Sequence, residues 1–168
     1  NGEGGTTEWS EAGTFTTLPL PLPVSYIDEN GQEQTLQPGE YPLLTGTETT
    51  LGTAGQETWC VVHSTLDYSQ GIQLLGNPHI ILCDGAAMNI GSSESPVSGS
   101  SYQEQVGFYG SGNNLSLYAQ SGNTGALTIY SQSCSFDVKD LTIAGGNVNA
   151  TKISNNYLVI GCTNNLTV

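Results

Sequence analysis

The sequence predicts an all-β protein built as a parallel β-helix, a solenoid of stacked coils, with a β-sandwich as the alternative. From Thr58 onward no segment has the apolar spacing of an amphipathic helix, while short alternating apolar and polar runs recur between Gly, Asn and Ser clusters. Several runs share one motif, in which two aliphatic residues flank a polar or small one. These runs begin at Leu115, Leu127, Leu141, Leu158 and Leu166.

The spacing of these runs favours the solenoid. Leu115, Leu141 and Leu166 are separated by 26 and 25 residues, and Cys60 and Cys83 by 23. Such recurrence is typical of coils that hold two or three short strands and stack on one another. Leucine-rich strands also occur in sandwiches, and the stretch 92–105 interrupts the repeat, so spacing alone leaves both architectures open.

Two segments are expected before the solenoid. Residues 1–23 are acidic and glycine-rich and end in alternating prolines, which predicts an extended tether. Residues 24–57 are expected to form a β-hairpin and a segment that caps the open end of the solenoid. The Asn30-Gly31 pair predicts a type I′ turn between strands 24–27 and 34–36.

The solenoid is expected to span 58–168. Within it, the stretch 115–133 predicts two walls joined by a corner, where Gly122 and Gly125 allow the bend and Asn123 adopts a left-handed backbone. The expected strands begin at Trp59, Ile72, Ile80, Ala87, Val106, Leu115, Ala126, Phe136, Tyr157 and Asn165.

The charge balance excludes nucleic acid as a partner. The chain carries fifteen acidic residues against two lysines and no arginine, which gives a net charge of −13. A protein of this charge is repelled by nucleic-acid phosphates and by anionic membranes. Only 10% of residues are charged, against the roughly 25% usual in globular domains, which indicates an exported protein. We therefore expect an extracellular or cell-surface location, with no transmembrane segment.

The four cysteines predict disulfides rather than a metal site. No Cys-x-x-Cys pair is present, and an even count suits an oxidising compartment, although buried free thiols are the alternative. Adjacent coils would bring Cys60 and Cys83 within disulfide reach. A Cys134–Cys162 bond is a weaker expectation, because it needs a loop insertion. The acids of the hairpin lack the spacing of a calcium loop, so we expect neither metal nor cofactor.

Four motifs resemble a group of secreted, cell-surface proteins of gut bacteria. The motifs are DENGQEQ, TTLGTAGQETWCVV, HIILCDGAAMNI and NNLSLYAQSGNTGALTI, and the likeness covers roughly 26–151. The resemblance implies a right-handed parallel β-helix-like domain of carbohydrate-binding or adhesin-like type. It implies little about activity, because fold and function are separable.

Enzymatic chemistry finds weak support in the sequence. A β-helix lyase needs a base, and with no arginine the candidate is Lys139, which is better explained as a solvated wall residue. A glycoside hydrolase needs two facing carboxylates, and nothing in the sequence pairs the candidates. A triad of His63, Ser64 and Asp67 is too local. The candidate carboxylates are Asp67, Asp84, Asp137 and Asp140.

Binding is the better supported prediction. Tyr118 and Tyr130 follow inward aliphatic residues and should face outward, and Tyr109 also lies in the β region. Aromatic rings beside Asn, Gln and Ser suit sugar recognition, although Tyr is also a common strand residue. We therefore expect no catalytic residue, and a surface binding or adhesion module that contacts glycans or a host or bacterial surface partner. A polysaccharide lyase, a glycoside hydrolase or an inactive relative is the alternative.

Overall fold

The protein is a β-solenoid of about five turns. The computed structural model describes residues 22–155 and 158–168, so the expected tether lies almost entirely outside the described residues. Within the described part there is no α-helix, and the one short helical segment is the 3₁₀ turn η1 (Gln103–Gln105). The prediction of a parallel β-helix is confirmed, because successive coils pair as parallel strands. No described helix has the length and hydropathy that crossing a bilayer requires.

Two sheets build the solenoid. The smaller sheet is wholly parallel and contains β4 (Thr65–Tyr68), β6 (Ala87–Ile90), β9 (Ala126–Ser131) and β11 (Asn147–Lys152). The larger sheet contains the solenoid strands β3 (Thr50–Val62), β5 (Ile72–Leu82), β7 (Val106–Gly110), β8 (Leu115–Ala119), β10 (Cys134–Ile143) and β12 (Ile160–Thr167), together with the hairpin strands β1 (Val24–Ile27) and β2 (Glu33–Leu36).

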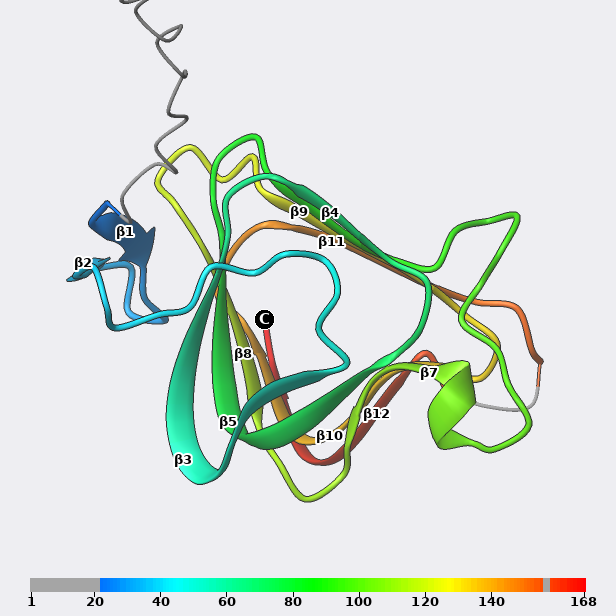
Figure 1. Ribbon diagram of the computed structural model, residues 1–168. Helices are drawn as coiled ribbons and strands as arrows, with labels where there is room; N and C mark the ends of the chain where they lie inside the picture. The colour runs from blue at the N-terminus through cyan, green and yellow to red at the C-terminus, as the bar shows by residue number, and fades with distance from the viewer. Residues whose placement is uncertain (1–21, 156–157) are drawn as a thin grey trace, which may run out of the picture.

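The larger sheet bends, so the coils have three walls (Figure 1). The first half of β5 pairs with β7 and its second half pairs with β8. We call the β7 side wall 1, the β8 side wall 2, and the smaller sheet wall 3. Gly76 lies at the bend with φ of 65°, and a Cβ there would be 2.2 Å from the Thr53 carbonyl oxygen. The bend therefore requires glycine.

Aliphatic side chains stack from coil to coil inside the three walls. Leu141 pairs in register with Leu115 on one side and with Leu166 on the other. This confirms the spacing on which the solenoid was predicted. The core continues into wall 3, where the register joins Met88 to Leu127, and both side chains are fully buried.

The N-terminal hairpin forms at the predicted residues but not with the predicted turn. A type I′ turn needs positive φ at two residues, and here Gly31 has φ of 76° while Asn30 does not reach positive φ. The Gly31 N–H donates to the Asp28 carbonyl at 3.0 Å, and the Asp28 N–H donates to the Gln32 carbonyl at 2.9 Å. The loop is a type I turn followed by a left-handed glycine.

The open end of the solenoid is covered by the segment after the hairpin. Figure 1 shows β1 and β2 outside the coils, while the chain between β2 and β3 crosses the opening. Leu43 pairs in parallel with Val61, and the neighbouring Leu44 is buried. Because β3 already begins at Thr50, the solenoid starts inside the segment 24–57 that we expected to precede it.

The corner after β8 agrees with the prediction. Asn123 has φ of 52°, and it is the one non-glycine residue with positive φ in the described part of the chain. Gly122 and Gly125 serve a different purpose from the one expected, since neither needs positive φ. An added Cβ would lie 2.4 Å from the Asp84 carboxylate at Gly122 and 2.5 Å from the Leu82 carbonyl oxygen at Gly125. These glycines permit close packing of neighbouring coils.

Candidate functional site

The three tyrosines predicted to bind a ligand do not form one surface. Tyr109 lies on β7 in wall 1, Tyr118 on β8 in wall 2, and Tyr130 on β9 in wall 3. Tyr109 and Tyr130 are half-buried, whereas Tyr118 is only 6% exposed. A single aromatic platform made of these three residues is therefore not formed.

Tyr118 is covered by the N-terminal hairpin. It faces outward, as predicted, but its ring lies 5.2 Å from that of Tyr26 and 5.5 Å from that of Trp59. Its hydroxyl donates to Glu29 Oε2 at 3.3 Å, and burial raises the pKa of Tyr118 to about 12. The ring of Tyr118 is therefore not exposed to a ligand in this structure. Strand alternation predicts that the side chain faces outward but says nothing about a hairpin that packs over the wall.

All four cysteines are free thiols. Cys60 pairs with Ile80, and Cys83 lies three residues beyond that position, so the predicted Cys60–Cys83 disulfide is absent. The Cys134–Cys162 bond is also absent, because Cys162 is opposite Val138, four residues along β10 from Cys134. Burial raises the pKa of Cys60 to about 12 and that of Cys83 to about 11, which keeps both thiols protonated and unreactive.

Two of the candidate catalytic carboxylates tie neighbouring coils together. Asp84 accepts the N–H of Gly122 and the N–H of Thr124, each at 3.0 Å. Asp140 accepts the Asn165 N–H at 3.0 Å in the same way. Asp84 itself lies in a turn, and the N–H groups that its carboxylate accepts belong to the next coil. These hydrogen bonds lower the pKa of Asp84, with that of Thr124 contributing most.

The remaining catalytic candidates are dispersed. Asp137 lies in wall 1, where burial raises its pKa, and Lys139 is exposed on the same strand. His63 is exposed in the short connection after β3. His79 is a wall residue, with its ring 4.5 Å from that of Trp59 and its Nε2 paired with Glu57. Of the four candidate carboxylates, only Asp67 lines the cleft described next.

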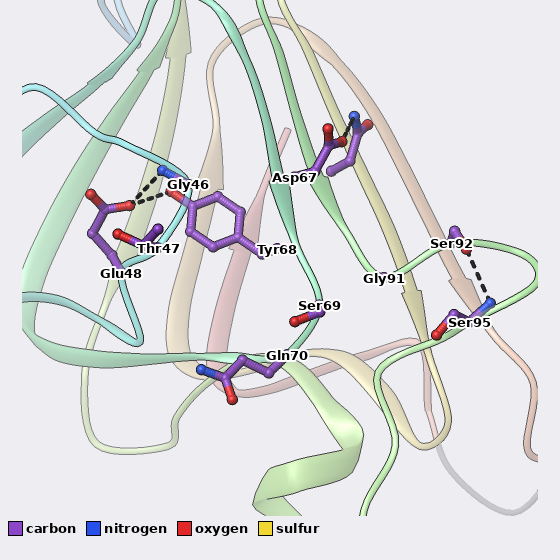
Figure 2. A pocket seen from close by; sticks show the side chains of 11 residues that line it. Gly46, Thr47, Glu48, Asp67, Tyr68, Ser69, Gln70, Gly91, Ser92 and Ser95 are labelled. Carbon is purple, nitrogen blue, oxygen red and sulfur yellow. Dashed lines mark hydrogen bonds between the residues drawn. The ribbon is translucent and has the colours of Figure 1, made fainter.

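A cleft of about 520 Å³ opens near the capped end of the solenoid, on wall 3 and the corner that follows it. Figure 2 shows Glu48 and Tyr68 at one side of this cleft and Ser92 and Ser95 at the other. Its polar lining includes Thr47, Glu48, Asp67, Gln70, Asn89 and Ser92. The lining therefore comes from the capping segment, from β4 and β6, and from the loop that follows β6.

Glu48 holds the rim of the cleft in place. Its Oε2 accepts hydrogen bonds from the Gly46 N–H at 3.0 Å and the Tyr68 hydroxyl at 2.8 Å, and its Oε1 accepts the Thr45 N–H at 2.8 Å. Burial opposes ionisation of Glu48, but these hydrogen bonds outweigh it and lower its pKa to about 2. Because both of its carboxylate oxygens accept hydrogen bonds, Glu48 holds the capping segment against β4.

Asp67 and Asn89 form a hydrogen-bonded polar pair in the lining of the cleft. They are in register on β4 and β6, and the Asn89 amide donates to Asp67 Oδ1 at 2.8 Å. Both side chains point outward from wall 3, because the inward positions on these strands belong to Leu66 and Met88. The pair presents a carboxylate oxygen and an amide carbonyl as acceptors, with the second amide N–H as a donor.

A second hollow of about 360 Å³, the side hollow, lies on the wall 1 side of the same corner. Gln70 lines both the cleft and the side hollow. The side hollow also contains Tyr109, Gln103 and Glu104. The Ser101 and Ser100 N–H groups lower the pKa of Glu104 and tie it into its own loop.

The loop 91–105 supplies residues to both hollows. Ser92 and Ser95 line the cleft, and Ser98, Gln103 and Glu104 line the side hollow. This is the stretch that interrupts the repeat in the sequence. The interruption is thus a signal in the sequence that points to the site, because an insertion in a regular solenoid forms a projecting loop at a corner.

The chemistry of both hollows is that of hydroxyl, amide and carboxylate groups. No lysine, arginine, histidine or cysteine lines either one. Across residues 22–155 and 158–168, no group of three His, Cys, Asp or Glu side chains has an arrangement suited to a metal ion. The site is equipped to exchange hydrogen bonds with a polar, uncharged molecule.

No family model, no curated protein and no solved structure matches this chain. The resemblance to secreted proteins of gut bacteria therefore stays a prediction, as does the location outside the cell.

Proposed function

We propose that this protein is a non-enzymatic binding module that holds a neutral glycan in the cleft beside Gln70. The observation that carries the proposal is the Asp67–Asn89 pair, set in a hollow with Gln70 and several hydroxyl groups. Sugar hydroxyls both donate and accept hydrogen bonds, so they suit a site that mixes carboxylate and amide groups.

The charge of the cleft favours a neutral sugar over an acidic one. Asp67 and Glu48 line the cleft without a cation beside them, and the whole chain has a net charge of −13. A uronic acid or a sulfated sugar would bring a further negative charge into this field and would bind poorly. Hydroxyl groups can instead donate to the free oxygen of Asp67.

Tyr109 offers an aromatic face in the side hollow. It is the one predicted ligand-binding tyrosine that lines either hollow described above, and it is half-buried rather than covered. An aromatic ring stacks on the apolar face of a sugar ring. An oligosaccharide that crosses Gln70 would place one residue in the cleft and the next beside Tyr109.

The test is a glycan array that contains neutral and acidic oligosaccharides, followed by titration of the best neutral glycan. We expect Asn89→Ala to weaken binding about tenfold, since it removes one or two hydrogen bonds to the ligand. The matched control is Asn149→Ala. Asn89 and Asn149 are both in register with Thr128, one on each side of it. Asn149 therefore lies in the same column of wall 3 as Asn89, but two coils further along the solenoid. Equal effects of the two variants would contradict the proposed site.

A reducing-sugar release assay on the same glycans separates the binding module from an enzyme. Binding without release supports the module, whereas release that Asp67→Asn abolishes would replace it with a hydrolase. If no glycan binds, a protein on a host or bacterial surface becomes the better candidate partner. A binding module of this kind would serve adhesion at a cell surface.

A further inference from the structure

A column of outward side chains on wall 1 continues the side hollow along the solenoid. Gln73 pairs in register with Tyr109, and Tyr109 pairs with Asp137 on the following coil. All three side chains face outward, because the residue before each of them on its strand is fully buried. Neighbouring strands lie about 4.8 Å apart, so Gln73 and Asp137 flank Tyr109, which lines the side hollow. We call these three residues the wall 1 column.

Asp137 is a half-buried acid that has no partner in the described part of the chain. Its carboxylate forms no hydrogen bond or ion pair there. Burial raises its pKa, and Lys139 on the same strand does not offset this effect. Asp84 and Asp140, by contrast, each accept a backbone N–H of a neighbouring coil. Carboxylates that hold a fold together are hydrogen-bonded, so the Asp137 carboxylate is available to a ligand.

The side of Asp137 away from Tyr109 is not occupied by a side chain of the next strand. Asp137 is in register with Gly161 on β12. A Cβ added at Gly161 would lie 3.9 Å from Asp137 Oδ1, which is ordinary contact distance. The carboxylate therefore has the ring of Tyr109 in register on one side and a residue without a side chain on the other.

The groups of the wall 1 column suit a positively charged donor. The column offers a carboxylate, the amide oxygen of Gln73 and the electron-rich face of Tyr109. No lysine or arginine lines the adjoining side hollow, so no cation of the protein competes there. The net charge of −13 also attracts cations to the surface. An ammonium group can donate to the carboxylate and to the amide oxygen and lie against the ring.

We propose that the wall 1 column binds the protonated amine of an amino sugar, within a linear glycan whose neutral unit lies in the cleft. This inference rests on the proposed function and names the class of glycan. The chain of sugars would leave the cleft over Gln70, pass through the side hollow and run along wall 1. Asp137 accepts hydrogen bonds from the amine, and Tyr109 stacks on the sugar ring that carries it.

The test extends the glycan array with the free-amine form of every member that contains an N-acetylated amino sugar. The best pair, acetylated and free amine, is then titrated by calorimetry at low salt. We expect the free-amine form to bind about tenfold more tightly, because it adds a charge-assisted hydrogen bond. Asp137→Asn should remove this preference and leave the affinity for the acetylated form unchanged. The control is Glu33→Gln, which removes the same charge on the hairpin and should keep the preference.

Thermal unfolding tests whether Asp137 is a ligand-binding rather than a structural residue. Asp137→Asn should melt at the same temperature as the unaltered protein or above it, since it removes a half-buried charge without a partner. Asp84→Asn makes the same change in charge and should melt lower, because the Asp84 carboxylate accepts two backbone N–H groups.

The outcomes separate this inference from the proposed function. If no member of the array binds, both fail together. If an acetylated glycan binds through Asn89 and the free amine adds no affinity, this inference alone is overturned. A preference for the amine that survives in Asp137→Asn, or an Asp137→Asn variant as destabilised as Asp84→Asn, would also overturn it.

Discussion

At the scale of single residues, the corners of the solenoid depend on side chains that reach the next coil. Asp84 accepts two backbone N–H groups of the following corner, and Asn123 in that corner accepts the Gly146 N–H of the coil after it at 2.6 Å. Such bonds satisfy backbone groups that the strand ladders leave unpaired. They explain why acids in the solenoid can be structural even where a sequence suggests catalysis.

Gly125 should be intolerant of substitution for a steric reason. Its φ is ordinary, but a Cβ would lie 2.5 Å from the Leu82 carbonyl oxygen, so Gly125→Ala must push two coils apart. We expect a loss of about 1–3 kcal/mol in the free energy of unfolding, measured by chemical denaturation. Gly112→Ala is the control, because a Cβ there meets no atom within 4 Å. A Gly125→Ala variant as stable as the Gly112→Ala variant would show that the corner is loosely packed.

The pH dependence of stability should carry a contribution from Glu48. Hydrogen bonds in the folded state lower the pKa of Glu48 from 4.5 to about 2. A carboxyl with a lowered folded pKa stabilises the protein above its unfolded pKa, and this contribution is lost as the pH falls through the folded pKa. The difference in melting temperature between the unaltered protein and Glu48→Gln should therefore shrink as the pH falls from 4.5 towards 2. A difference that stays constant over this range would contradict the role assigned to Glu48.

At the scale of elements, the hairpin β1–β2 is a cover for wall 2. Outward residues of a solenoid wall are usually polar, yet Trp59, Ile81 and Tyr118 lie on the outside of wall 2. The hairpin meets them with Tyr26, whose ring is 4.8 Å from that of Trp59. A single backbone pairing between Ile27 and Ala119 joins the hairpin to β8. Aromatic contacts therefore provide much of the attachment.

Tyr26→Ala should release the hairpin from wall 2. Removing a buried aromatic side chain costs about 3–5 kcal/mol, and Trp59 and Tyr118 would then face water. The chain has two tryptophans, so fluorescence is measured in a Trp9→Phe background, in which Trp59 emission should shift to the red. Tyr130→Ala on wall 3 serves as the control and should leave the emission unchanged. An unshifted spectrum for Tyr26→Ala would mean that the hairpin is held by other contacts.

At the scale of the whole molecule, sequence repeats predicted the fold but not every register. The column of Leu115, Leu141 and Leu166 was predictable, because the coils between these residues have nearly equal lengths. The predicted Cys60–Cys83 disulfide is absent because the residue opposite Cys60 on the next coil is Ile80. The first coil is therefore 20 residues long at this position, and not 23. Coil length depends on each corner, and corners tolerate insertions that strands do not.

The cleft could not be assembled from the sequence. Its residues come from three stretches, 46–48, 67–70 and 89–95, and only the folded corner places them together. Asp67 and Asn89 are 22 residues apart, which matches one coil, but many polar pairs share that spacing. The burial of Tyr118 could not be predicted from the sequence either, because it depends on where the hairpin packs. Tyr109 alone among the predicted tyrosines retains a place beside the site.

The most direct test of the proposed binding site is the map of amide chemical shifts on titration with the neutral glycan that binds best on the array. We expect shifts at Asp67, Gln70 and Asn89, with none at Thr128 and Asn149 further along the same wall. Shifts centred on Thr128 and Asn149, with the cleft unchanged, would contradict the proposal that the cleft beside Gln70 is the binding site.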